Sequence, residues 1–224
     1  MNTAIKFAAS SIIGLVVLGF ILFYPAGTFN YWQAWVFIAV FTIATYAPSL
    51  YLAHTDPAAL KRRMHGGPLA EARTVQKFII IGAFAGLFAM MAFSAYDHRV
   101  GWSSVPTAVC VIGDLLIVAG LVGAMLVVVQ NRYAGASIRV EEGQKLASTG
   151  LYKLVRHPMY AANLVLMVGI PLALGSYWGL LLIIPAQLVL VLRILDEEKL
   201  LTQELGGYRE YQQHVRYRLV PYVW

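Results

Sequence analysis

Long apolar segments are the feature that most constrains this chain. Four of them run over residues 4–24, 32–53, 78–96 and 105–129, and a fifth apolar region occupies 160–192. A helix that crosses a bilayer needs about 20 apolar residues, so each of the four segments is long enough to cross. Of the 224 residues, 59% are hydrophobic and only 12% are charged, whereas about a quarter of the residues in a soluble domain are charged. The sequence therefore predicts an integral membrane protein.

The fifth apolar region is too long for a single helix. It contains Pro171, and Gly175 and Ser176 follow closely. Proline removes a backbone donor and glycine permits a turn, so we expect two arms, about 160–174 and 178–195. The predicted fold class is all-α: a polytopic transmembrane helical bundle of about four spans, a C-terminal helical hairpin and a cytosolic amphipathic tail helix. The first apolar segment is longer than the core of a signal peptide, and we expect it to be retained as a helix.

Basic residues are distributed unevenly between the two sides of such a bundle. With the N-terminus in the cytoplasm, 16 of the 17 Lys and Arg residues fall on the cytoplasmic side and only Arg99 falls on the other. Basic residues near helix ends are retained in the cytoplasm. We therefore expect the 54–77 loop, the 130–156 segment and everything from Arg193 onward to be cytoplasmic, in a membrane such as a prokaryotic inner membrane. Membrane topology also explains the net charge of +6 without nucleic acid as a partner.

Several common kinds of catalytic site have no counterpart in the sequence. With Cys110 as the one cysteine, neither an internal disulfide nor a thiolate metal cluster can form. No HExxH pair, Walker-type glycine loop, GxSxG elbow or GxGxxG fingerprint occurs. Zinc protease, nucleotide hydrolase, serine hydrolase and dinucleotide-domain chemistry therefore lack their characteristic residues, and we expect no metal. We therefore expect any catalysis to depend on His, Tyr, Arg and Glu side chains together with a bound small molecule.

Two polar groupings flank the predicted hairpin. One is VEEGQKLASTGLYKLVRHPMY, at residues 140–160, and the other is RILDEEKLL, at residues 193–201. Since a hairpin returns to the membrane depth at which it begins, we expect both groupings to face one cavity. His157 and Pro158 start the hairpin, because proline is tolerated in the first helical turn, and the free N–H groups of that turn could receive an anion.

The acidic run after Arg193 has two interpretations. Arg193 and Glu197 are four residues apart and could pair on one helix face, with Asp196 and Glu198 pointing toward water. The same spacing is compatible with an exposed ion pair at a helix end, and Arg156 and His157 could simply extend to lipid headgroups.

The two groupings, taken together with the tail that follows them, resemble a known family. GQKLASTGLYKLVRHPMYAANL, an apolar hairpin, DEEKLL, LGGYREYQQHV and a final RLVP are similar in combination to the isoprenylcysteine carboxyl methyltransferases, to which phospholipid methyltransferases are more distantly related. The resemblance implies N-terminal transmembrane helices over 1–129, with the basic cytosolic loop 54–77, and a methyltransferase core over 130–224. The sequence departs from the family at Gln144, where a histidine is common, and in its spacing before Tyr208, which is one residue shorter.

The resemblance also implies a cofactor and roles for individual residues. S-adenosylmethionine would be the methyl donor, and Arg193 matches the family's substrate-orienting arginine. An amine or thiol acceptor must lose a proton, for which His157 and Glu198 are the candidate catalytic residues. An isoprenylcysteine-like carboxylate is already ionised and needs no base. The donor-binding residues carried over by position are Gln144, Lys145, Leu146, Ala147, Tyr152, His157, Pro158, Met159, Tyr160 and Glu197.

We therefore expect an integral membrane methyltransferase that moves a methyl group from S-adenosylmethionine to a lipophilic acceptor arriving laterally from the bilayer. The acceptor is either a lipophilic small molecule or a lipid-linked substrate, and membrane lipids are further partners. One alternative is a membrane reductase of the sterol-reductase type that uses NADPH, which would need further polar residues for a second phosphate. Another is a non-enzymatic small transporter or accessory protein, which would have no affinity for the methyl donor.

Overall fold

The computed structural model describes residues 3–64, 67, 69–71, 73–134, 137–138 and 140–224, and within these ranges all regular structure is helical. Parts of the predicted 54–77 loop (65–66, 68 and 72) and of the predicted core (135–136 and 139) lie outside the described residues. The predicted all-α class is confirmed. The helices are α1 (Thr3–Ala26), α2 (Trp32–Thr55), α3 (Pro57–Met64), α4 (Thr74–Val100), α5 (Thr107–Gln130), the 3-10 helix η1 (Gly150–Lys153), α6 (Pro158–Ala173), the 3-10 helix η2 (Trp178–Leu182), α7 (Ile183–Glu204) and α8 (Tyr208–His214).

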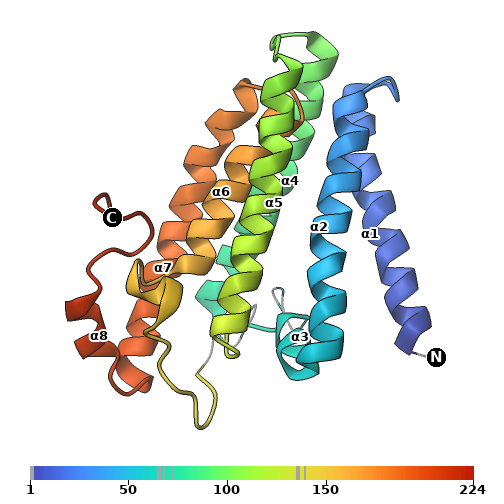
Figure 1. Ribbon diagram of the computed structural model, residues 1–224. Helices are drawn as coiled ribbons and strands as arrows, with labels where there is room; N and C mark the ends of the chain where they lie inside the picture. The colour runs from blue at the N-terminus through green and yellow to red at the C-terminus, as the bar shows by residue number, and fades with distance from the viewer. Residues whose placement is uncertain (1–2, 65–66, 68, 72, 135–136, 139) are drawn as a thin grey trace.

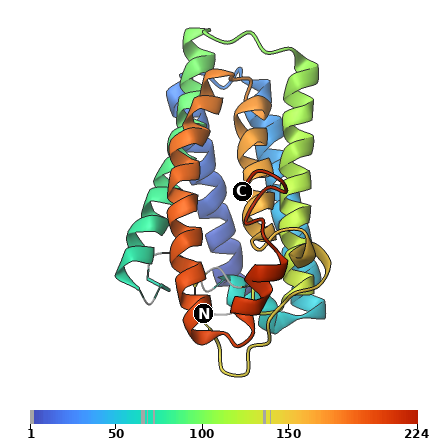
Figure 2. The same ribbon diagram turned by 90° about the vertical axis from the view of Figure 1, so that its left-hand side faces the viewer.

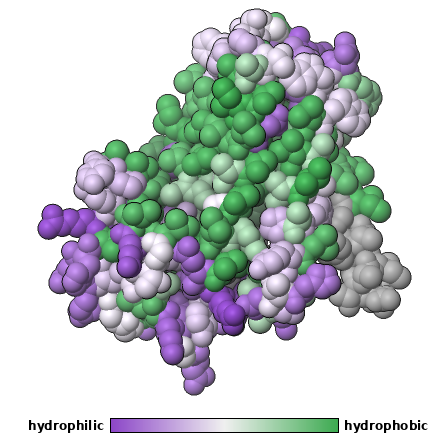
Figure 3. Space-filling view, viewed as in Figure 1, coloured by the Kyte–Doolittle hydropathy of each residue, from purple (hydrophilic) through white to green (hydrophobic). Residues whose placement is uncertain are grey.

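Four of these helices are long and apolar enough to cross a membrane: α2, α4, α5 and the continuous η2–α7 helix. The Ile12–Ala26 part of α1 and helix α6 are shorter apolar helices. Figure 3 shows hydrophobic side chains over the middle of the molecule, with the most hydrophilic groups gathered at its lower end. Large apolar side chains such as Ile43, Leu115 and Ile184 are more than half exposed, as expected where lipid replaces water as the surrounding medium.

The turn of the predicted hairpin is confirmed between α6 and η2. Pro171 lies inside the last turn of α6, and the chain reverses at Gly175, whose φ of 71° is in the left-handed region that glycine readily adopts. The second arm continues to Glu204, beyond the predicted end at 195. The tail after it is a short helix, α8, followed by an irregular segment.

Helices α5 and α6 pack through glycines. A Cβ added at Gly113 would lie 2.2 Å from the backbone nitrogen of Ala173, and one at Gly120 would lie 2.8 Å from the carbonyl oxygen of Ala162. Small residues let the backbones of membrane helices approach closely. This contact places the start of α6 beside the end of α5.

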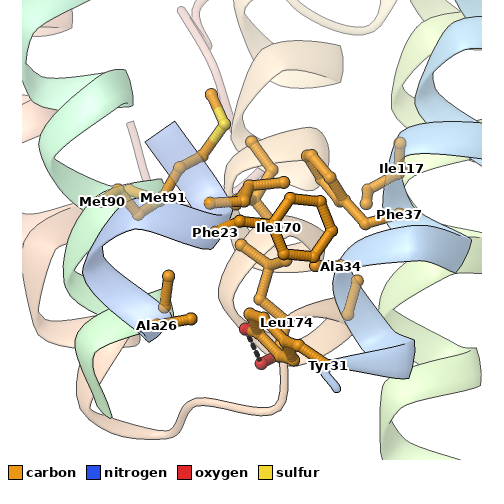
Figure 4. Close-up of a cluster of buried hydrophobic side chains, with 13 residues drawn as sticks. Phe23, Ala26, Tyr31, Ala34, Phe37, Met90, Met91, Ile117, Ile170 and Leu174 are labelled. Atoms are coloured by element: carbon orange, nitrogen blue, oxygen red, sulfur yellow. Dashed lines mark hydrogen bonds between the residues drawn. The ribbon is translucent and has the colours of Figure 1, made fainter. Parts of the chain in front are cut away.

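A buried apolar cluster joins α1, α2, α4, α5 and α6, including Phe23, Phe37 and Ile170 (Figure 4). At its edge the Tyr31 hydroxyl donates to the carbonyl oxygen of Leu174 over 2.6 Å, which ties the start of α2 to the hairpin turn. The core therefore fixes the turn end of the hairpin and leaves the other end of the bundle to polar residues.

The segments that contain the polar groupings lie at the end of the bundle opposite the hairpin turn. Figure 1 shows α3, α8 and the connection from α5 to α6 at the same end as the N-terminus, opposite the α4–α5 connection. Figure 2 shows α7 beside α4, and α6 beside α5. The two ends of the hairpin therefore meet where the sequence predicts a shared cavity.

Candidate active site

A cavity of about 310 Å³ lies at this polar end of the bundle. Its size is within the range of small-molecule sites. Arg193 lines it, and Glu198 is not part of its lining. All ten residues that the resemblance assigns to the donor line the cavity: Gln144, Lys145, Leu146, Ala147, Tyr152, His157, Pro158, Met159, Tyr160 and Glu197.

Tyr160 connects the two ends of the hairpin across the cavity wall. Its hydroxyl donates to Glu197 Oε2 over 2.7 Å and accepts a hydrogen bond from Arg193 Nε over 3.0 Å. The sequence predicts a possible direct pair between Arg193 and Glu197, whereas the structure places the Tyr160 hydroxyl between them. One hydroxyl thus sets the positions of a cation and an anion that both line the cavity.

Two residues outside the predicted site hold the guanidinium of Arg193. Arg193 Nη1 donates to Gln76 Oε1 over 2.9 Å, and Nη2 lies 3.0 Å from Glu71 Oε1 as an ion pair. Arg193, Glu71 and Gln76 are 7%, 3% and 0% exposed. Sequence reasoning missed Glu71 and Gln76 because both lie within the predicted basic loop 54–77. A glutamine in the first turn of an apolar helix is the signal that could have indicated them.

Asp196 also has protein partners, and the expectation that its side chain points toward water is wrong. It forms an ion pair with Arg73 at 2.8 Å and accepts a hydrogen bond from Gln76 Nε2 over 2.5 Å. Since the Gln76 amide nitrogen faces Asp196, its oxygen faces Arg193. Asp196 therefore fixes which way the Gln76 amide is turned.

Glu198 is the centre of a second buried cluster, and the expectation that it points toward water is wrong as well. It is 6% exposed. Its Oε1 lies 2.8 Å from Arg156 Nε and 3.2 Å from His157 Nε2, and its Oε2 accepts from Arg218 Nε over 2.9 Å. The Arg156 Nε–H is not aligned with that oxygen, so this contact is an ion pair and not a hydrogen bond. Glu198 thereby joins α7, the start of α6 and the C-terminal segment, which comprises residues 215–224 after α8.

The C-terminal segment is bound to the residues that precede α6. The backbone nitrogens of Arg156 and His157 donate to the carbonyl oxygens of Tyr217 and Arg218, both over 2.9 Å. His157 also stacks on Tyr160, with ring centroids 5.6 Å apart. The cavity wall around His157 is therefore fixed by backbone, ring and charge contacts together.

Helix α8 places two tyrosines in the cavity wall. The Tyr211 hydroxyl donates to the carbonyl oxygen of Tyr152 over 2.7 Å. The Tyr208 hydroxyl is buried and has no hydrogen-bond partner among the described residues. Burial raises the pKa of Tyr152, Tyr208 and Tyr211 above the usual tyrosine value, so all three phenols stay protonated and can donate at neutral pH.

The basic helix α3 contributes a residue, Arg63, to the cavity lining, which was not predicted. Arg62 pairs with Glu141 at 3.1 Å, and Arg63, which lines the cavity, lies 3.8 Å from the sulfur of Met159 through Nη1. Asn131 also lines the cavity and donates to the Tyr152 hydroxyl over 3.0 Å. The predicted interfacial loop thus contributes directly to the site.

Within the described part of the chain, no group of three or more His, Cys, Asp or Glu side chains could hold a metal ion. Residues 108–208, from the start of α5 to the start of α8, match the sequence model of a family described as phospholipid methyltransferase. The chain matches none of the curated proteins with which it was compared.

Proposed function

We propose that the protein is a membrane methyltransferase that takes its methyl group from S-adenosylmethionine and passes it to a lipophilic acceptor, since residues 108–208 match the phospholipid methyltransferase family model. The observation that carries this proposal is the 2.7 Å hydrogen bond between Tyr160 and Glu197 in the cavity wall. It joins the two ends of the hairpin at a cavity lined by every residue that the resemblance assigns to the donor.

The residues around the cavity suit the chemical groups of the donor. Glu197, whose side chain is 22% exposed, offers a carboxylate for the ammonium group or the ribose hydroxyls. The rings of Tyr152 and Tyr160 suit the adenine or the cationic sulfur. The buried Tyr208 hydroxyl, which lacks a partner among the described residues, is a polar atom that a ligand would satisfy. The observed side chains therefore fit this cofactor.

The protein's part in the reaction is to position the reactants and exclude water. When bound, the donor supplies a methyl group on a positively charged sulfur that an in-line displacement can transfer. Arg193 and Glu197 keep the Tyr160 hydroxyl fixed between them, and Tyr208 and Tyr211 of α8 line part of the cavity. We assign Arg193 to orienting the acceptor beside the donor.

His157 is the candidate for accepting a proton from an amine or thiol acceptor. It lines the cavity, and its Nε2 faces Glu198. Glu198, the other sequence candidate, is paired with two arginines and supports His157 from outside the cavity lining. We therefore place Glu198 in the role of positioning His157. We further propose that this end of the bundle faces the cytoplasm, because the described segments that carry most of the basic residues lie there.

The test is a transfer assay with the purified full chain in detergent. The protein is incubated with S-adenosylmethionine labelled in its methyl group and with lipid extracts, and the organic phase is counted. The proposal predicts label in an organic-soluble product that S-adenosylhomocysteine suppresses. A folded protein that labels no lipid extract, or that shows saturable NADPH binding in a parallel titration, would contradict it.

A further inference from the structure

The chain itself supplies a carboxylate to Arg193. Glu71 lies in the connection between α3 and α4, and its Oε1 lies 3.0 Å from Arg193 Nη2. Its second oxygen, Oε2, accepts a hydrogen bond from the backbone nitrogen of Ile138 over 3.1 Å. One Glu71 oxygen therefore pairs with Arg193 of α7, and the other accepts a hydrogen bond from the segment between α5 and α6.

This pair is buried and electrically compensated. Glu71 and Arg193 are 3% and 7% exposed, so water contributes little to solvating either charge. Gln76, turned by Asp196, and the hydroxyl of Tyr160 satisfy two further positions on the guanidinium. The positive charge of Arg193 is thus balanced by Glu71 before any acceptor enters the cavity.

This balance changes the energy of binding a charged acceptor. A carboxylate that enters the cavity must lose its hydration, and this costs several kcal/mol unless an unbalanced cation receives it. Displacing Glu71 from Arg193 would leave a buried carboxylate without its ion and could free the Ile138 nitrogen from its acceptor, both unfavourable. An uncharged acceptor meets neither cost.

We propose that Glu71 determines acceptor specificity: by compensating Arg193, it favours acceptors whose reacting group is an uncharged N–H or S–H over carboxylates. This inference rests on the proposed function. In such a transfer, the lone pair on nitrogen or sulfur forms the new bond to the methyl carbon. The electron pair of the broken carbon–sulfur bond stays on the donor sulfur, which becomes neutral, and the acceptor's proton leaves to His157 or to water.

The experiment compares two probes that share one tail and differ in charge. Dodecanoate and dodecanamide are titrated into the purified full chain, saturated with S-adenosylhomocysteine, at a pH where the acid is ionised. The wild type is expected to bind the amide at least as tightly as the acid. Glu71→Gln, which uncovers the charge of Arg193, is expected to shift the ratio of the two Kd values toward the acid by about tenfold or more.

Glu141→Gln is the matched control, because Glu141 is an acid at the same end that pairs with Arg62. It should leave the wild-type ratio unchanged. A wild type that binds the acid more tightly than the amide overturns the inference, and this result does not depend on whether Glu71→Gln folds. An equal shift in both variants, or no shift in a folded Glu71→Gln, overturns it too.

A second measurement separates this inference from the proposed function. Labelled methyl transfer is measured to dodecanethiol and to dodecanoate, whose methyl ester releases labelled methanol in base. The wild type is expected to label the thiol, and Glu71→Gln is expected to increase the base-labile label from the acid. Failure to bind S-adenosylhomocysteine would contradict the proposed function. Normal binding with base-labile ester as the main wild-type product would contradict the role of Glu71 alone.

Discussion

The Tyr160 hydroxyl donates to Glu197 Oε2 over 2.7 Å, although 37 residues separate the two positions in the sequence. The contact exists because the α6–α7 hairpin turns at Gly175 and returns its second arm to the level of its first. A hairpin arm shorter by one helical turn would carry Glu197 about 5 Å away from Tyr160. Site geometry therefore depends on hairpin length as well as on residue type.

Replacing Arg193 with alanine should separate transfer from donor binding. Arg193 holds Tyr160 and balances Glu71, so its loss is expected to reduce the kcat of methyl transfer by about 100-fold. The Kd for S-adenosylhomocysteine should change by less than about threefold. Kinetics and calorimetry on the same preparation check this. Equal losses in kcat and in donor affinity would show that Arg193 has been assigned the wrong role.

Replacing Glu197 with glutamine should weaken donor binding. The substitution removes the charge that we assign to the donor's ammonium or ribose, and a hydrogen bond to a charged group contributes about 1.5–3 kcal/mol. The Kd for S-adenosylhomocysteine is expected to rise by about 10- to 100-fold. Glu204→Gln, at the exposed end of α7, is the control and should bind as the wild type does. Unchanged affinity in Glu197→Gln would contradict the assignment.

The fold could be predicted from the sequence because membrane helices are set by length and apolarity. The hairpin turn and the start of α6 at Pro158 follow from proline and glycine chemistry, and the convergence of Tyr160 with Glu197 follows from hairpin geometry. The division of the chain at residue 129 stays a prediction. Helix α5, on its N-terminal side, lies almost entirely within the matched 108–208 segment and packs closely on α6.

Several contacts in and around the cavity could not be predicted in the same way. Glu71, Gln76 and Arg63 reach the site from a region whose composition indicates only a cytoplasmic loop. Asp196 and Glu198 have the composition of an exposed acidic run, and their partners come from segments far apart in the chain. Long-range ion pairs leave no local pattern, so helical spacing alone assigned both acids to water.

Glu198 should contribute to stability. Glu198→Ala leaves Arg156, which is 8% exposed, without its carboxylate, and breaking a buried ion pair costs about 3–5 kcal/mol. Arg218→Gln removes a partner whose side chain is 30% exposed, so its cost is expected to be less than about 1 kcal/mol. Thermal unfolding in detergent compares the two. Equal stability of Glu198→Ala and the wild type would contradict the anchoring role.

The glycine packing of α5 on α6 can be tested with a single methyl group. Gly113→Ala places a Cβ against the backbone of Ala173, and overpacking of this kind costs about 1–3 kcal/mol. Gly14→Ala is the matched control, because a Cβ there meets nothing within 4 Å and alanine is the better helix former. The unfolding temperature should fall for Gly113→Ala and stay level or rise for Gly14→Ala. The opposite order would show that this helix contact is looser than described.

In the proposed function, the two ends of the α6–α7 hairpin together enclose the methyl donor. Ultraviolet crosslinking of the purified full chain with labelled S-adenosylmethionine, followed by peptide mapping, identifies the segments that contact the donor. We expect label in peptides from 144–163 and from 193–208, and loss of that label with excess S-adenosylhomocysteine. Label confined to α1 and α2, or label that the competitor does not reduce, would contradict it.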